Sequence, residues 1–294
     1  MKAATRKIKA AARRALTACM GRLGYVRRDA YERPYIIQKS TEGVDFLFHV
    51  RDQHSRLWYD LYCTDPVWLE MRFIRDHLLA PGDIAIECGS HHGATTILLS
   101  RWVGPSGKVY AYEPGGTNYG VLVENLELNG IRNVVAIQAA VGDTEGFVEF
   151  EEFSGSSMAS RVHAAAMPQA SVPTAKVRQA TLDAHAPERP ALIKIDTQGY
   201  VYQPLLGARK LIEEQRPNLA LEIDGIEAVR EYGDNFFRIF ELIDHPDYEY
   251  FVAFAASEYP SPVALREVIT RWKSLNNLSG NIHLFARNRN RGAR

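Results

Sequence analysis

The sequence predicts an α/β protein with a doubly wound, mostly parallel sheet of seven strands, preceded by an N-terminal extension of helix and strand. Short apolar strands alternate with helical segments from about residue 83 onward, a glycine turn follows the first of these strands, and acidic residues end several of them. The expected strands are 83–87, 108–113, 133–139, 191–196, 217–223, 249–255 and 281–287. The expected helices are 93–103, 117–129, 201–214 and 231–243. No obvious strand-helix unit leads into the last strand, which favours an antiparallel closing strand.

Composition narrows the class of protein. The 294 residues include 35 basic and 35 acidic side chains, so the formal net charge is zero and no basic footprint for nucleic acid is visible. The hydrophobic fraction of 46% suits a globular protein with a sizeable core. Cys19, Cys63 and Cys88 are widely spaced and odd in number, which favours a reducing, cytoplasmic location. No apolar run approaches the roughly 18 residues of a membrane span.

We divide the chain into an N-terminal extension at 1–80 and a main domain at 81–294. Residues 1–28 carry nine basic residues and no acidic one, with apolar residues at helical spacing. This segment predicts a basic amphipathic helix, either solvated or packed, or in weak contact with an anionic membrane surface.

The rest of the extension predicts a strand followed by a helix. Apolar side chains alternate along 44–50, as in a half-buried strand, and a helix is expected at 67–79. Four aromatic residues lie between them and either join the core or line a ligand cleft: Trp58, Tyr59, Tyr62 and Trp68.

An insert at 153–175 interrupts the main domain. Small and polar residues dominate it, and Pro168 and Pro173 oppose regular structure. Long irregular inserts in compact domains are functional loops or flexible segments. We interpret this one as a lid on the substrate side, with a flexible insertion as the alternative.

The segment from Asp83 to Asn129 predicts a nucleotide-binding half-site. An apolar strand ends at Glu87, a turn from Gly89 to Gly93 opens a helix, and the next strand ends at Glu113. Glycine lets the backbone approach a ligand closely, and the helix start presents free N–H groups. An acid about 20 residues beyond such a loop is placed to accept both ribose hydroxyl protons.

The loop favours S-adenosylmethionine over NAD. Ser90, His91 and His92 replace the middle glycine of the dinucleotide fingerprint, so a pyrophosphate would be crowded. S-adenosylmethionine has no phosphate, and its amino-acid end can lie over such a loop. A nicotinamide oxidoreductase is therefore the disfavoured alternative. The predicted cofactor-binding residues are Glu87, Gly89, Ser90, His91, Gly93, Glu113, Pro114, Gln138 and Ala139.

Asp196 is the first candidate catalytic residue, because it ends the fourth strand at the edge where α/β sheets place their chemistry. It can take a hydroxyl proton, alone or with Glu222 and Asp224 at the end of the next strand. The same carboxylates can hold a divalent ion, although no ligand pattern supports a metal. Lys194 leaves the same face of the strand, so a buried Lys–Asp pair is the structural alternative. His163 is a second candidate base, because imidazole titrates near neutral pH.

Three blocks of sequence carry a resemblance. They are PGDIAIECGSHHG, YEPGGTNYGVLVENLELNG and TLDAHAPERPALIKIDTQGYVYQPLLGARKLI, in that order between Pro81 and Asp224. They resemble segments of the FkbM-like S-adenosylmethionine-dependent methyltransferases. The first block resembles that family's first strand and turn, and the second resembles its helix with the spaced residues E-P, N, L, N and N. The third resembles its L-D, I-K-I-D-x-x-G and L-x-G-A segments. The resemblance implies a Rossmann-like class I methyltransferase fold and methylation of hydroxyl groups, often on sugars or natural products.

The sequence departs from that family at three positions. The family commonly has Asn at the position of His91 and Glu at the positions of Gln198 and Val201. We expect an O-methyltransferase acting on a hydroxyl of a sugar, glycan or natural-product-like small molecule, without a nucleic-acid partner. The alternative, suggested by the two lost carboxylates, is a catalytically inactive binding or scaffold protein that keeps the fold.

Overall fold

The computed structural model describes residues 33–62, 68–152, 161–163, 174–187, 189–225, 229, 232–233, 236–254, 258–274 and 281–291. One compact unit runs from Tyr35 to Arg294 and contains all the elements described below. The predictions for 1–28, Cys19, Cys63 and most of the insert lie outside the described residues. In the described part of the chain, no helix is both long enough and apolar enough to cross a membrane.

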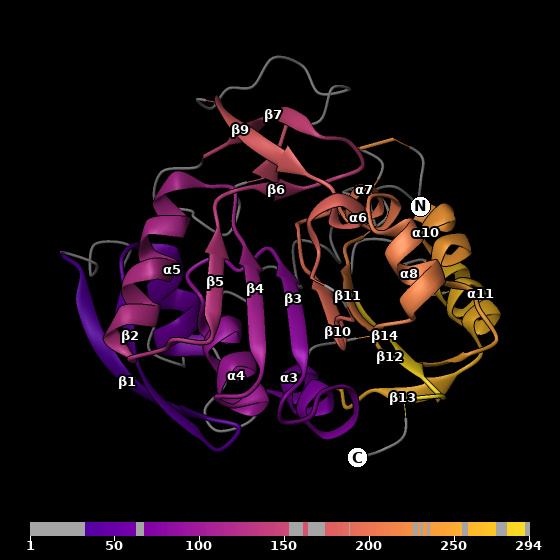
Figure 1. Cartoon of the computed structure of the whole chain (residues 1–294), viewed down its shortest axis with the longest axis horizontal. Coiled ribbons are helices and arrows are strands. Elements are labelled where there is room, and N and C mark those ends of the chain that lie inside the picture. The colour runs from indigo at the N-terminus through magenta and orange to yellow at the C-terminus, as the bar shows by residue number, and fades with distance from the viewer. Residues whose placement is uncertain are drawn as a thin grey trace, which may run out of the picture. The chain divides into compact units, whose positions relative to one another are not determined.

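A central sheet of eight strands organises this unit (Figure 1). Five strands pair in parallel: β5 (Val134–Ile137), β4 (Lys108–Tyr112), β3 (Ile84–Cys88), β10 (Leu192–Ile195) and β11 (Asn218–Ile223). The antiparallel β14 (Ile282–Asn288) lies between β11 and β12 (Tyr248–Ala253). All seven predicted strands are present, and the antiparallel closing strand is confirmed. The eighth strand, β13 (Ser261–Val263), escapes prediction because it is a three-residue edge strand with a proline at its centre.

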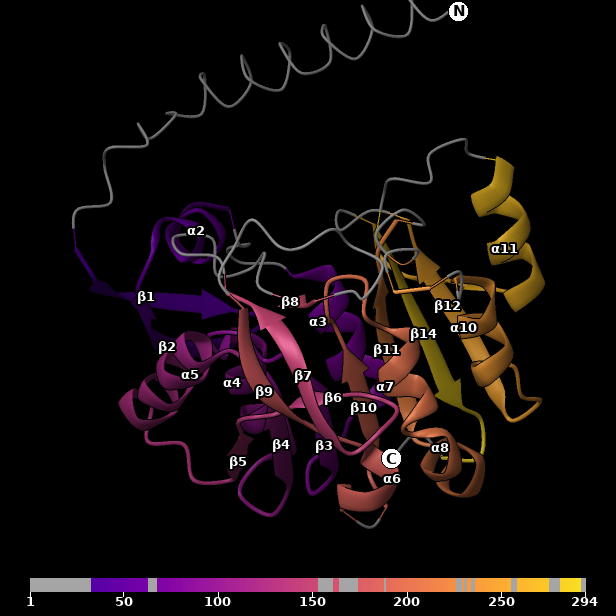
Figure 2. The same ribbon diagram turned by 90° about the horizontal axis from the view of Figure 1, so that it is seen from above.

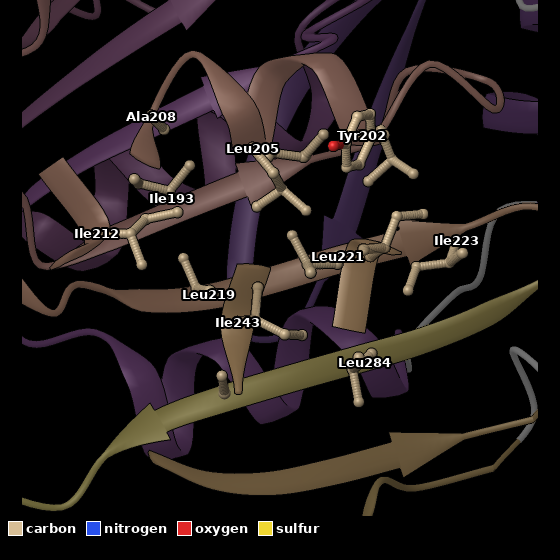
Figure 3. Packing of buried hydrophobic residues seen from close by; sticks show 14 of the residues in the cluster. Ile193, Tyr202, Leu205, Ala208, Ile212, Leu219, Leu221, Ile223, Ile243 and Leu284 are labelled. Carbon is tan, nitrogen blue, oxygen red and sulfur yellow. The ribbon is translucent and has the colours of Figure 1, made fainter. Parts of the chain in front are cut away.

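The sheet separates two apolar cores, because its strands send alternate side chains to opposite faces. Ile193 of β10 lies in one core, with residues of α7 (Tyr202–Leu206), α8 (Arg209–Gln215) and α10 (Phe236–Ile243), as Figure 3 shows. Ile195 belongs to the same core. Leu192 lies in the other core, with residues of α4 (Ala94–Val103) and α5 (Gly116–Leu128). Each fully buried Leu or Ile stabilises the fold by about 1.5–3 kcal/mol.

The helix expected at 201–214 is two helices, α7 (Tyr202–Leu206) and α8 (Arg209–Gln215). They separate at Gly207, where a Cβ atom would lie 1.8 Å from the carbonyl oxygen of Gly142. Asp183 of α6 (Leu182–His185) then caps α8 from outside, because its carboxylate accepts the N–H groups of Lys210 and Leu211 at 3.1 and 2.8 Å. The L-x-G-A segment thus contains the glycine at which the helix is interrupted, and the aspartate of the L-D segment caps the helix that follows.

The N-terminal part of the compact unit begins with a hairpin, β1 (Tyr35–Thr41) and β2 (Val44–Val50). Short helical segments follow: α2 (Gln53–Ser55), the π-helical η2 (Arg56–Tyr62), α3 (Leu69–Phe73) and the π-helical η3 (Ile74–Leu78). Asn125 and Asn129 of α5 accept the backbone N–H groups of His49 and Leu47, at 2.7 and 2.8 Å. These asparagines therefore attach the hairpin to the helix that follows the glycine loop.

A second, smaller sheet lies beyond the carboxyl ends of β3, β4 and β5 in both Figure 1 and Figure 2. It consists of β6 (Ala140–Val141), β7 (Gly146–Glu151), β8 (Arg161–Val162) and β9 (Thr174–Ala180). Part of the predicted insert is therefore regular structure, because β8 and the start of β9 belong to it. In Figure 1, α11 (Leu265–Ser274) lies at the right, on the side of the unit opposite the β1–β2 hairpin.

Candidate active site

A cavity of about 650 Å³ opens at the carboxyl ends of β3, β4, β10 and β11. Phe150, Arg161 and Val162 of the small sheet line it from above, and Trp58, Tyr59 and Trp68 line it from the N-terminal segment. Its volume lies in the usual range for small-molecule sites, about 300–1,000 Å³. Of the aromatic residues for which the sequence left core and cleft open, Trp58 lines the cleft, whereas Tyr59 and Trp68 line the cleft and also pack in or against a core cluster.

The glycine loop adopts an alternating backbone in which Gly89, His91 and Gly93 have φ of 88°, 50° and 88°. Its first two amides are already used, because Gly89 and Ser90 both donate to the carbonyl of Tyr112, at 2.9 and 3.0 Å. The loop is therefore held by the neighbouring strand β4 as well as by its own turns.

Gly89 is required by the protein itself. A Cβ atom at this position would lie 1.9 Å from the carbonyl oxygen of Asp196. The sequence analysis attributes this glycine to the approach of a ligand, and the structure adds a packing reason that no local pattern reveals. Gly93 likewise packs against Leu122, whose Cδ1 would lie 2.6 Å from an added Cβ.

Glu113 lies beside this loop on the cavity wall and is only 4% exposed. Its carboxylate accepts the backbone N–H groups of His91 and Gly115, at 2.8 and 2.9 Å. Burial raises the pKa of Glu113 to about 7, against the lowering effect of these hydrogen bonds. A carboxylate has about four lone-pair sites, so this one retains acceptor capacity for a ligand.

Six of the nine predicted cofactor residues line the cavity: Gly89, Ser90, His91, Glu113, Pro114 and Ala139. The other three lie outside its lining. Glu87 is fully buried and accepts hydrogen bonds from the hydroxyls of Thr95 and Thr96, and burial raises its pKa. Gly93 opens α4, and Gln138 is exposed. Glu87 therefore connects the end of β3 to the first turn of α4, which follows the loop, and does not face the cavity.

The part of the cavity wall at the ends of β10 and β11 is built around a buried lysine. Lys194 is 1% exposed, and its ammonium lies 3.1 Å from Asp196 and 3.9 Å from Glu70 of α3. Burial alone would lower the pKa of Lys194, but the carboxylates of Asp196, Glu70 and Glu87 raise it above its ordinary value. The Lys194–Asp196 pair that the sequence offers as the structural alternative is therefore present, and Asp196 also lines the cavity.

Glu222 and His283 extend this polar wall. They are directly opposite each other in the pairing of β11 with β14, and both line the cavity. Glu222 accepts a hydrogen bond from Asn281 at 2.6 Å. Its pKa is raised well above the ordinary value by burial and by the nearby carboxylates of Asp196 and Glu70.

The remaining candidates are held differently. Asp224 accepts the backbone N–H of Gly199, so it shapes the turn that follows β10. His163 is not among the residues that line the cavity; its Nδ1 lies 2.6 Å from the Glu151 carboxylate. In the described part of the chain, no group of three or more His, Cys, Asp and Glu side chains is arranged to hold a metal.

Sequence reasoning did not identify Glu70, Asn281 or His283 as site residues. They come from α3 and from the final strand, at sequence distances where no local motif connects them to Asp196. The only available signal was the alternation of β14, which places His283 on the same face of the sheet as Glu222.

The topology and the site together define the class of protein. Five parallel strands in the order β5-β4-β3-β10-β11, an antiparallel strand inserted before the last long one, a glycine loop after β3 and an acid after β4 are the features of a class I S-adenosylmethionine-dependent methyltransferase. The profile of the Methyltransferase FkbM domain matches residues 87–250, which is more than half of the 294-residue chain. The chain therefore belongs to the FkbM methyltransferase family.

Solved structures with a related fold include an FkbM methyltransferase from Methylobacillus flagellatus KT, at 15% identity over 80% of this chain and 56% of that chain, with a TM-score of 0.43. An S-adenosylmethionine-dependent O-methyltransferase from Thermotoga maritima shares 15% identity over 85% and 77% of the two chains, with a TM-score of 0.42. An rRNA methylase from Streptococcus thermophilus shares 14% identity over 74% and 93%, with a TM-score of 0.43. No curated protein sequence matches this chain significantly.

The residues of the cavity fit the methyl donor that the family implies. Glu113 presents a carboxylate of the kind that accepts hydrogen bonds from ribose hydroxyls, and Pro114 and Ala139 line the cavity beside it. The hydroxyl of Tyr112 is buried at the cavity wall and has no hydrogen-bond partner among the described residues. A buried hydroxyl is costly unless it is paired, so a polar group of a bound ligand would satisfy it.

Proposed function

We propose that this protein transfers the methyl group of S-adenosylmethionine to a hydroxyl group of a small, carbohydrate-like or natural-product-like acceptor. The observation that carries this proposal is the single cavity that joins Glu113 to Asp196 and Glu222. A donor held at Glu113 and an acceptor held at Asp196 would share one enclosed space, which is what direct transfer between them requires.

When bound, the cofactor supplies a methyl group on a positively charged sulfonium. The protein then has two tasks, to orient the acceptor oxygen and to receive its proton. Asp196 is the group placed to receive the proton, and Lys194 fixes its carboxylate at 3.1 Å. Trp58 is 46% exposed and lines the cavity, so its ring can offer a flat face to the apolar side of a sugar ring.

The family commonly has glutamate at positions 198 and 201, and only the first of these two positions lies on the cavity. Gln198 lines the cavity in a turn with φ of 54°, so its side chain can still donate and accept hydrogen bonds there. Val201 is 1% exposed and packs in the core, away from the cavity lining. The cavity therefore keeps Asp196 and Glu222 on the wall that also holds Glu70, despite both departures.

The test combines binding with transfer. Calorimetry with S-adenosylmethionine, S-adenosylhomocysteine and NAD is expected to show binding of the first two only. Transfer of a labelled methyl group is then measured over sugars, phenols, natural-product alcohols and an RNA oligonucleotide. We expect methylation of a hydroxyl compound. Donor binding without transfer to any acceptor supports the inactive binding protein instead, and methylation of RNA alone contradicts the small-molecule acceptor.

A further inference from the structure

Tyr59 lies outside the part of the chain that matches the family profile, yet it reaches the glycine loop. It belongs to η2, and its hydroxyl is hydrogen-bonded to Nδ1 of His91 at 2.7 Å. Its ring packs on Phe48 of the hairpin, with 4.6 Å between ring centroids. The tyrosine therefore connects the N-terminal segment to the centre of the loop.

His91 is the one residue of this loop that needs such support. Its φ of 50° lies in the left-handed region, which is costly for a residue with a Cβ atom. Its ring stacks on His92, with 3.9 Å between centroids and 16° between the planes. Strained backbone of this kind persists only where surrounding contacts determine it, and the Tyr59 hydrogen bond and the His92 stack are such contacts.

The conformation of His91 matters because its backbone faces the ribose acid. The N–H of His91 donates to Oε2 of Glu113 at 2.8 Å, while Gly115 donates to Oε1. The Asn118 amide also donates to Oε1, at 3.4 Å, so a rotation of the His91 peptide would remove the donor to Oε2 and leave that oxygen less firmly oriented. The contacts therefore run from Tyr59 through the His91 ring and peptide to Glu113.

We infer that Tyr59 is a positioning residue for the methyl donor: by holding His91 in its left-handed conformation, it fixes the Glu113 carboxylate in the orientation that ribose hydroxyls require. This inference rests on the proposed function, because it presumes that Glu113 binds ribose. It assigns the N-terminal segment a part in donor binding, which the family profile at 87–250 does not include.

The inference makes the effect of Tyr59 depend on the residue at position 91. Asparagine, aspartate and histidine are all enriched in the left-handed conformation, and asparagine tolerates it through local hydrogen bonds of its short side chain. A His91→Asn protein should therefore keep the loop conformation without the tyrosine. The test is a double-mutant cycle with wild type, Tyr59→Phe, His91→Asn and the double variant, in which coupling is measured directly.

Dissociation constants for S-adenosylhomocysteine are measured by calorimetry, together with KM for the donor and kcat at saturating donor. Loss of one hydrogen bond predicts that Tyr59→Phe raises the dissociation constant and KM about threefold to tenfold, with kcat changed less than about twofold. In the His91→Asn background, the same change should alter the dissociation constant by less than about twofold. Tyr35→Phe is the matched control, because the Tyr35 hydroxyl donates to Asp60 at 2.5 Å and Tyr35 does not line the cavity.

Each alternative outcome has a defined meaning. An unchanged dissociation constant in Tyr59→Phe overturns the inference, and so does an equal loss in both backgrounds, which would make Tyr59 a direct contact of the donor. An equal loss in Tyr35→Phe would reduce the effect to general destabilisation and also overturn it. A wild-type protein that binds no S-adenosylhomocysteine overturns the proposed function as well, and this result is distinguishable from the others.

Discussion

The carbonyl oxygen of Asp196 lies against Gly89, only 1.9 Å from where a Cβ atom of that residue would be. The end of the strand that carries the candidate base is thus in contact with the first residue of the cofactor loop, although the two are far apart in sequence. The relative position of the two halves of the site therefore depends on a contact that admits only glycine.

Gly89→Ala is expected to destabilise the fold by about 2–4 kcal/mol, from the left-handed φ and from the clash with Asp196. Thermal unfolding without ligand measures this loss. Gly120→Ala is the control, because Gly120 lies inside α5 with nothing within 4 Å of an added Cβ. The control should be neutral or up to about 1 kcal/mol more stable. A Gly89→Ala protein with normal stability and impaired donor binding would show that the ligand alone requires this glycine.

Glu113→Ala should weaken donor binding by about 2–4 kcal/mol, because it removes a charged acceptor of hydrogen bonds from a buried site. Calorimetry with S-adenosylhomocysteine measures the change, and circular dichroism confirms that the variant is folded. Glu149→Gln, at an exposed position of β7, is the control. Unchanged affinity in folded Glu113→Ala would remove the ribose assignment.

Donor binding should strengthen as pH rises through 7. The pKa of Glu113 is raised from 4.5 to about 7 by burial, so without ligand the carboxyl holds its proton to a higher pH than in the unfolded chain. This group therefore lowers the stability of the free protein as pH rises from about 4.5 to 7. Ribose hydroxyls donate to the ionised form, so the dissociation constant should be about tenfold larger at pH 6 than at pH 8. Glu113→Gln should lose most of this dependence; an equal dependence in that variant would assign it to another group.

Asp196→Asn should reduce turnover at least about a hundredfold while donor affinity stays nearly intact, because a general base typically contributes this much. Single-turnover transfer assays on the folded variant measure the effect. His163→Ala is the comparison, since His163 is held by Glu151 away from the cavity lining and should change turnover less than about threefold. If Asp196→Asn loses stability but keeps its turnover per folded molecule, Asp196 serves only as the partner of Lys194. Glu222, which lines the same cavity, would then become the leading candidate base.

Asp183→Ala should cost about 0.5–2 kcal/mol of stability, because it removes the cap of α8. Donor affinity and turnover per folded molecule should not change, since Asp183 does not line the cavity. Asp183→Asn retains one of the two acceptor oxygens and should recover part of the stability. A loss of turnover in Asp183→Ala without a loss of stability would give this family-typical aspartate a catalytic role.

The helices and strands of the fold could be predicted because the spacing of apolar residues within each segment indicates its secondary structure. β10 illustrates this, since a short apolar run ending in Asp196 is sufficient to predict a buried strand and its functional edge. The break between α7 and α8 could not be predicted, because its cause is the approach of Gly207 to Gly142 from another part of the chain.

In the site, too, residues at strand ends could be predicted, whereas residues brought there from distant parts of the chain could not. Glu113 and Asp196 follow from their places at strand ends, and the structure puts both on one cavity. Glu70 and His283 could not be predicted, because only the folded sheet brings α3 and β14 to Asp196. Glu87 has the expected place in sequence, but its side chain faces Thr95 and Thr96 instead of the cavity.

The small sheet above the cavity enters the chain between β5 and β10, that is, between the strands that carry the donor half and the acceptor half of the site. Its strands pair only with one another in the described residues, so changes in their length or sequence need not disturb the pairing of the central sheet. The roof of the cavity can therefore change in length and sequence without altering the strands that lead to Glu113 and Asp196. Relatives with the same methyl donor can thus reshape this one wall of the cavity by altering a single continuous stretch of their genes, whereas Trp58, Glu70 and His283 belong to its other walls.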